Sequence, residues 1–260
     1  MCWEIIETNL GILGTFTFYF LSLTIFACLI VGLTFLLRRN RWKKGDLSFS
    51  LLLFAFAFTL LYHVFILTNF YFDNPNRLFF PIYFTLSFGP LLFFAVKLWL
   101  YSNYVFEWSD LKHAILPFCQ FLYFVWLFFH PAEIKQDWDR NFYSPFYGAM
   151  EMALYIGTFY AYLYSAYRYI RYKDASLRHS KNDSAKRQVL LMKRLIQVLF
   201  VLFWVNSAYI VGDFVIYEIL KYDLHSVKGF TRFGDLSFAS IALWTAWWGW
   251  RSRKRRRKTV

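Results

Sequence analysis

Four ionisable side chains that could bind a ligand or move a proton stand inside apolar stretches of the sequence. They are His63, Glu151, Asp213 and Asp235. An ionisable group inside an apolar segment is costly to bury and therefore indicates a functional site. His63 is the side chain type whose charge changes near neutral pH, which suits a proton switch. We therefore predict a polar site around these residues that takes a small ligand or senses pH.

Further polar side chains repeat at helical spacing beside these groups. Asn206 and Tyr209 share one stripe with Asp213, and Tyr155 follows Glu151 by one turn. The predicted ligand-binding set is His63, Glu151, Tyr155, Asn206, Tyr209, Asp213 and Asp235. Plain packing would give the same pattern, because aromatic stripes usually pack and buried carboxylates also form structural hydrogen bonds.

The segments that carry these residues have the length and composition of membrane-spanning helices. The 260 residues are 58% hydrophobic and 17% charged, whereas a soluble domain carries about 25% charged residues. Seven apolar runs have about the 20 residues that a helix needs to cross a bilayer: about 12–37, 47–70, 79–101, 112–129, 145–167, 189–219 and 231–250. The helices of a soluble core would be shorter, with one polar face. We predict an all-α, polytopic seven-transmembrane-helix bundle over 1–250 and a basic cytoplasmic tail over 251–260.

Basic residues predict the orientation of this bundle. If the runs alternate in direction, 23 of the 29 lysine and arginine residues fall on one side of the membrane, and 11 of the 16 acidic residues on the other. Positive charge stays in the cytoplasm, so the N-terminus is predicted outside and the C-terminus inside. The four ionisable groups then lie about 6–11 Å below the outer rim. The basic face is expected to meet a lipid bilayer with an anionic inner leaflet.

The sequence contains no motif of a known catalytic or metal-binding chemistry. We find no Walker loop, HExxH, GxSxG or CxxC, and three cysteines cannot form a disulfide framework. The basic tail has neither a helix-turn-helix pattern nor zinc-ligand spacing. We therefore expect no catalytic residue, no metal, no cofactor and no sequence-specific binding of nucleic acid.

A helix-breaking pair, Gly89 and Pro90, lies inside the third apolar run. Glycine permits close approach of a neighbouring helix, and proline removes a backbone donor and kinks a helix. The pair is predicted to act as a hinge. Lys97 and His113 are predicted to anchor the inner interface, where Lys97 can reach lipid phosphate or pair with an acidic residue. Ordinary anchoring and a movable latch both fit these residues.

The stretches FGPLLFFAVKLWLY (88–101) and FEWSDLKHAILPF (106–118) resemble the membrane-embedded amino-terminal region of AraC-type transcriptional regulators of Bacteroidetes-like bacteria. The resemblance is carried by Gly89, Pro90, Leu91, Leu92, Val96 and Lys97, and by Asp110, Leu111, His113, Leu116, Pro117 and Phe118. In that family a DNA-binding domain follows the last span, whereas this sequence ends ten residues after Trp250. The resemblance implies a sensor module, standing alone or cut from a longer chain, that signals to a separate partner.

The leading prediction is a sensor of the bacterial inner (cytoplasmic) membrane. A small ligand or a proton would act from the outer side, and a cytoplasmic regulator or kinase would read the change at 168–194. A small transporter or an accessory subunit of a membrane complex is an alternative, which would need a polar path across the whole membrane. An integral-membrane enzyme acting on lipid is another, which would need an acid and base pair among the four ionisable groups.

Overall fold

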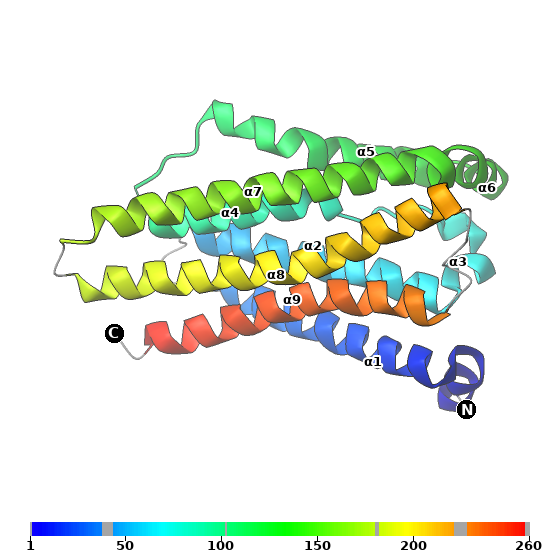
Figure 1. Ribbon diagram of the computed structural model, residues 1–260. Coiled ribbons are helices and arrows are strands. Elements are labelled where there is room, and N and C mark those ends of the chain that lie inside the picture. The colour runs from blue at the N-terminus through cyan, green and yellow to red at the C-terminus, as the bar shows by residue number, and fades with distance from the viewer. Residues whose placement is uncertain (1, 38–43, 102, 180–181, 221–227, 258–260) are drawn as a thin grey trace.

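The chain folds into a bundle of helices that run along one common direction (Figure 1). The computed structural model describes residues 2–37, 44–101, 103–179, 182–220 and 228–257, and every regular element within them is a helix. In chain order these are α1 (Cys2–Leu36), α2 (Lys44–Leu67), α3 (Phe70–Asp73), η1 (Pro75–Arg77), η2 (Thr85–Ser87), α4 (Phe88–Leu100), η3 (Trp108–Ala114), α5 (Ile115–Phe128), α6 (Ala132–Trp138), η4 (Asp139–Tyr147), α7 (Gly148–Ser176), α8 (Asp183–Leu220) and α9 (Lys228–Arg257). The all-α prediction is confirmed for the described residues.

Six of the described helices form a closed ring in chain order. Helix α1 packs on α2, α2 on α4, α4 on α7, α7 on α8, α8 on α9, and α9 returns to α1. Helix α5 lies outside this ring and packs against η2 and η3. The ring brings α2 and α9, which are far apart in the sequence, into direct contact.

Four helical stretches are long and apolar enough to cross a membrane. They are Gly11–Leu36, Lys44–Leu67, Trp108–Phe128 and Asp183–Tyr217. These stretches coincide with four of the seven predicted runs. Helices α7 and α9 are also long, but tyrosines in α7 and a basic end in α9 make them less apolar. The structure therefore supports a helical protein that associates with a membrane.

The third apolar run, predicted as one span over 79–101, is not one helix. Phe79 adopts a left-handed φ of 62°, and the short 3₁₀ helix η2 precedes α4, which begins at Phe88. Pro90 is therefore the third residue of α4. Backbone N–H groups in a first turn have no intrahelical partner, so proline costs little there. Pro90 lies at the start of a helix and not at a bend inside one, which corrects the expected kink.

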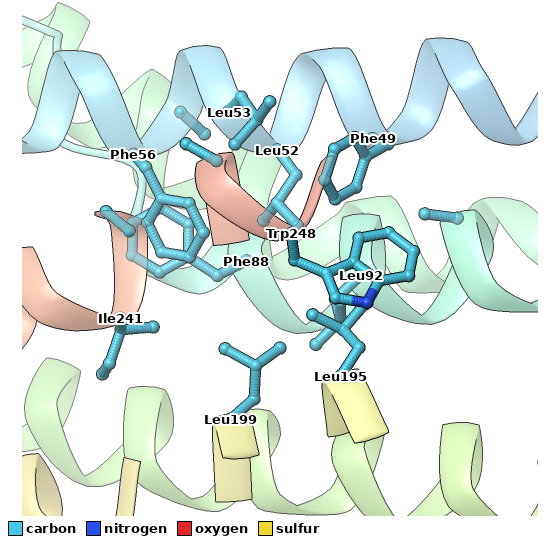
Figure 2. Packing of buried hydrophobic residues seen from close by; sticks show 14 of the residues in the cluster. Phe49, Leu52, Leu53, Phe56, Phe88, Leu92, Leu195, Leu199, Ile241 and Trp248 are labelled. Atoms are coloured by element: carbon cyan, nitrogen blue, oxygen red, sulfur yellow. The ribbon is translucent and has the colours of Figure 1, made fainter. Parts of the chain in front are cut away.

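The core lies where α2, α4, α8 and α9 face one another (Figure 2). Its labelled members are Phe49, Leu52, Leu53, Phe56, Phe88, Leu92, Leu195, Leu199, Ile241 and Trp248. On the other side of α9, Cys28 of α1 lies with its Sγ 3.7 Å from the carbonyl oxygen of Ala242. Small buried residues such as Ala242 and Ala246 allow this close approach of α1 and α9.

The start of α1 and the end of α9 lie at opposite ends of the bundle (Figure 1). Helices α3 and α6 lie at the end where α1 starts, which we call the outer end after the predicted orientation. The end of α9 marks the inner end. Helix α9 continues to Arg257, so the predicted boundary at residue 250 falls within a helix.

Candidate functional site

At the outer end, a charged group joins α2 to α9. His63 lies one turn before the end of α2, and its Nδ1 lies 3.0 Å from Oδ1 of Asp235, in the second turn of α9. Arg232 lies with NH1 3.6 Å from the other carboxylate oxygen of Asp235. The side chains of His63, Asp235 and Arg232 are 26%, 12% and 19% exposed. The group is therefore partly exposed at the surface of the bundle.

A second polar contact joins α8 to α9 on a different face of α9. Asn206 is buried, and its Nδ2 donates to Oγ of Ser237 at 2.9 Å. The Ser237 hydroxyl donates to the carbonyl oxygen of Gly234 at 2.8 Å, which leaves it to act as the acceptor for the Asn206 amide. Asn206 Oδ1 is buried and has no hydrogen-bond partner among the described residues. Such an acceptor is costly unless water or a ligand supplies a donor.

Tyr209 and Asp213 continue this face of α8 toward the outer end. The Tyr209 ring crosses α9 at Gly234, where an added Cβ would lie 2.4 Å from Cε1 of the ring. Tyr209 also packs on Phe230, with ring centroids 4.6 Å apart. Asp213 and Asp235 both lie close enough to Tyr209 to act on its hydroxyl electrostatically. Tyr209 thus lies between the α8–α9 contact and the charged group on α2 and α9.

Glu151 belongs to a third group of hydrogen-bonded side chains, to which α5 and η2 also contribute residues. Glu151 is 1% exposed, and its Oε1 accepts a hydrogen bond from Nε2 of Gln120 on α5. Gln120 also donates to Oγ1 of Thr85 at 2.8 Å and accepts from the N–H of Leu86 at 3.2 Å. Tyr143 of the π-helix η4 donates to Oε2 of Glu151 at 3.3 Å. The carboxyl group therefore holds α5, α7, η2 and η4 together.

Tyr155, the other α7 residue in the predicted set, lies in an aromatic layer. It is buried and packs against Phe88 and Phe203, with ring centroids 6.1 Å and 5.3 Å apart. Phe159 lies on the same layer, 4.2 Å from Phe203 by ring centroids. This layer follows the Glu151 group toward the inner end and closes the bundle interior there.

At the inner end, Lys97 lies in a box of aromatic rings instead of reaching for lipid. Its Nζ lies 3.6 Å from the ring centroid of Tyr104 and 3.7 Å from Oδ1 of Asp110. Lys97 and Asp110 are both buried. Asp110 also accepts from the Tyr104 hydroxyl at 2.6 Å and from the Glu107 N–H at 3.0 Å. The hydrogen bond to Asp110 raises the pKa of Tyr104 to about 12.

His113 lies beside this box and connects it to Gly89. Its Nδ1 lies 2.7 Å from the Tyr162 hydroxyl on α7. The Tyr162 ring lies directly over Gly89, where an added Cβ would be 2.6 Å from Cδ2. Phe93 packs on both rings, with centroids 5.8 Å away in each case. The two stretches of the sequence that carry the family resemblance thus meet in space around Tyr162.

The structure distributes the predicted ligand-binding residues over three groups and not one. His63 and Asp235 contact each other, Asn206 and Tyr209 lie between α8 and α9, and Glu151 is tied to α5. Sequence reasoning missed the partners Gln120, Thr85, Arg232, Ser237 and Tyr143. The sequence contains a clue to two of these residues. Gln120 is a polar residue in an apolar run, and Arg232 stands three residues before Asp235.

The described residues contain no cluster of three or more His, Cys, Asp or Glu side chains that could hold a metal ion. No protein-family model, curated protein or solved structure matches the chain. The resemblance to AraC-type regulators stays a prediction.

Proposed function

We propose that the protein is a membrane-embedded sensor with seven spanning helices, an outer N-terminus and a cytoplasmic C-terminus. A proton or a small polar ligand acts on the charged group of His63, Asp235 and Arg232. The contact of His63 with Asp235 carries the proposal, because it joins α2 to the outer part of a helix that continues to the basic inner end. A change in this contact shifts α9 along its whole length, and a separate cytoplasmic regulator or kinase reads the shift.

Titratable and charged groups face His63 from each element around it. Asp235 and Arg232 lie on α9, Tyr83 lies in the segment before η2, and Tyr62 is its neighbour on α2. Protonation of the imidazole turns its hydrogen bond to Asp235 into an ion pair and strengthens it. Acidic conditions therefore tighten α2 against α9, and a ligand that competes for Asp235 loosens them.

The aromatic layer around Tyr155 favours a sensor over a transporter. A transporter needs polar groups that continue from the outer end to the inner end. Between the outer groups and the Lys97 box, the bundle interior is filled by Tyr155, Phe159 and Phe203 together with Phe88. A signal that crosses this layer is carried by movement of packed helices and not by passage of a solute.

Hydrogen exchange of the whole chain in lipid nanodiscs tests the proposal. We expect amides in the inner half of α9 to have higher protection factors, measured against the intrinsic exchange rate at the same pH, at about pH 5.5 than at about pH 7.5, the interval in which histidine usually changes charge. His63→Gln and Asp235→Asn should both abolish this difference. His130→Gln is the matched control, because His130 bonds the Trp126 carbonyl oxygen at 2.9 Å, away from α9. If the protection factors of these α9 amides still differ between the two pH values in both variants, the proposal is refuted.

A further inference from the structure

Glu151 is a buried carboxyl group with neutral hydrogen-bond donors around it and no cationic partner. It is 1% exposed, and no lysine, arginine or histidine among the described residues forms an ion pair with it. Its contacts are the Gln120 amide and the Tyr143 hydroxyl. A carboxylate in such a place loses its hydration without gaining an opposite charge, so it takes up a proton instead.

The described elements packed around Glu151 offer it phenols and no cation. Tyr62 of α2, Tyr83 before η2, Tyr123 of α5, and Tyr143 and Tyr147 of η4 lie near enough to interact with it electrostatically. All five are phenols and carry no positive charge. Asp139 acts on two of the same phenols, Tyr62 and Tyr123. None of these neighbours therefore supplies Glu151 with an opposite charge.

Gln120 occupies the position that a metal cation would need. The Leu86 N–H donates to Gln120 Oε1 at 3.2 Å, which fixes the orientation of the amide. Gln120 Nε2 must then point to Thr85 Oγ1 and to Glu151 Oε1. Because this donor already stands between the oxygens of Thr85 and Glu151, the site suits a proton and not a metal ion.

We infer that Glu151 is a proton-binding site, and that its neutral acid form holds α5, η2 and η4 against α7. The proton sits on Oε2, because Oε1 accepts from Gln120. The Tyr143 hydroxyl donates to Oε2 when Glu151 is a carboxylate. In the acid form this bond reverses, and Oε2 donates its proton to the phenol oxygen, since a phenol both donates and accepts. Tyr143 lies in a nine-residue π-helix, a rare form that is frequent at functional sites. Loss of the proton places a buried charge without a counterion at this junction and reverses the hydrogen bond to Tyr143 of η4.

The sign of the effect on stability follows from the proton balance. The unfolded chain releases the proton of a glutamic acid above about pH 4.3, whereas the folded chain retains it. The contribution of Glu151 is therefore complete in acid and is lost as the pH rises and the folded chain releases the proton. Glutamine resembles the neutral acid, because its oxygen accepts from Gln120 and its nitrogen donates to Tyr143. Glu151→Gln should keep the fold and abolish this pH dependence.

Infrared difference spectroscopy of the whole chain in lipid films tests the inference. The spectrum of wild type minus Glu151→Gln should contain the carbonyl band of a protonated carboxylic acid at about pH 7, where an exposed glutamate is ionised. The matched control is Glu133→Gln, an exposed position on α6, which should give a carboxylate band instead. A carboxylate band for Glu151 at that pH would overturn the inference.

Tyr143→Phe provides a second readout in case Glu151→Gln does not fold. Removing the phenol oxygen takes away the acceptor of the acid proton, so the acid carbonyl band should shift in frequency. An unshifted band would overturn the assignment of the proton to Oε2 beside Tyr143. Neither variant alters His63 or Asp235, so the outcome is independent of the proposed sensing contact.

Discussion

Gly89→Ala is expected to destabilise the contact between α4 and α7. A Cβ at this position lies 2.6 Å from Cδ2, 3.2 Å from Cγ and 3.3 Å from Cβ of Tyr162. Ordinary contact begins near 3.4 Å, so the ring edge must retreat by about 0.8 Å. Rotation of the ring does not relieve the clash, because the Tyr162 Cβ itself is too close. Helix α7 must move away from α4, and the Tyr162 hydroxyl moves away from His113.

The size of the effect is the balance of three contributions. Overpacking a close contact costs about 1–3 kcal/mol, and the lost hydrogen bond of Tyr162 to His113 costs about 0.5–1.5 kcal/mol. Alanine is a better helix former than glycine, which offsets about 1 kcal/mol of this loss. We therefore expect Gly89→Ala to lower the free energy of unfolding by about 0.5–3.5 kcal/mol.

Unfolding of purified protein in lipid nanodiscs measures this change. Gly157→Ala on α7 is the matched control, because a Cβ there meets nothing within 4 Å, and it should leave stability equal or slightly higher. Tyr162→Ala should remove most of the penalty of Gly89→Ala in a double-mutant cycle. If Gly89→Ala is as stable as Gly157→Ala, the close contact of Tyr162 with α4 is refuted.

Three further predictions concern the inner end. The pKa of Tyr104 is raised to about 12 in the folded chain, compared with about 10 in the unfolded chain. The contribution of Tyr104 to stability is therefore complete below about pH 10 and is lost as the pH rises through about 12. Tyr104→Phe should flatten this alkaline loss of stability in unfolding curves, and curves identical to wild type would contradict the role of the Tyr104 hydroxyl. Lys97→Met should lower the free energy of unfolding by about 3–5 kcal/mol, because it leaves Asp110 buried without its cation. The double change Lys97→Met with Asp110→Asn should lower it by less than the sum of the two single changes. Additive effects of the two changes would show that the pair is not coupled. Trp99→Phe removes the hydrogen bond from Nε1 to Asp46 Oδ1 at 2.7 Å and should lower the unfolding free energy by about 1.5–3 kcal/mol; an unchanged unfolding midpoint would contradict it.

The helical character of the chain could be predicted because it depends on local composition. Long apolar runs predict helices wherever the backbone must satisfy its own hydrogen bonds, as in α1, α2 and α8. The segment before α4 escapes this rule, because other elements satisfy its backbone. Phe84 N–H donates to Thr59 Oγ1 at 3.1 Å, and Leu86 N–H donates to Gln120. These donors need no helix, and the apolar sequence of the segment carries no sign of such distant partners.

The depth of the candidate site along the helices could be predicted from the sequence. The direction in which each side chain points around its helix axis could not. Counting residues from the helix ends placed His63 and Asp235 at similar depth, and they contact each other. Asp235 and Ser237 are about 200° apart around α9 at 100° per residue, so one faces α2 and the other faces α8. A single sequence gives the angles within one helix but not which neighbour each face meets. The division into three groups therefore came from the structure.

Glycines covered by aromatic side chains connect neighbouring helices of the bundle. An added Cβ would lie 2.7 Å from Trp99 at Gly45, 2.6 Å from Tyr162 at Gly89, 2.4 Å from Tyr209 at Gly234 and 2.7 Å from Phe49 at Gly249. These contacts join α2 to α4, α4 to α7, α8 to α9 and α9 to α2. Lipid tails are as apolar as leucine, so helices in a membrane gain stability from close fit instead of from removal of water. Three of the four contacts lie next to a polar group: Tyr162 to His113, Tyr209 to Asp235, and Trp99 to Asp46. A shift at any of these polar groups must therefore move a ring that has no free space on the facing helix, which couples local chemistry to helix position.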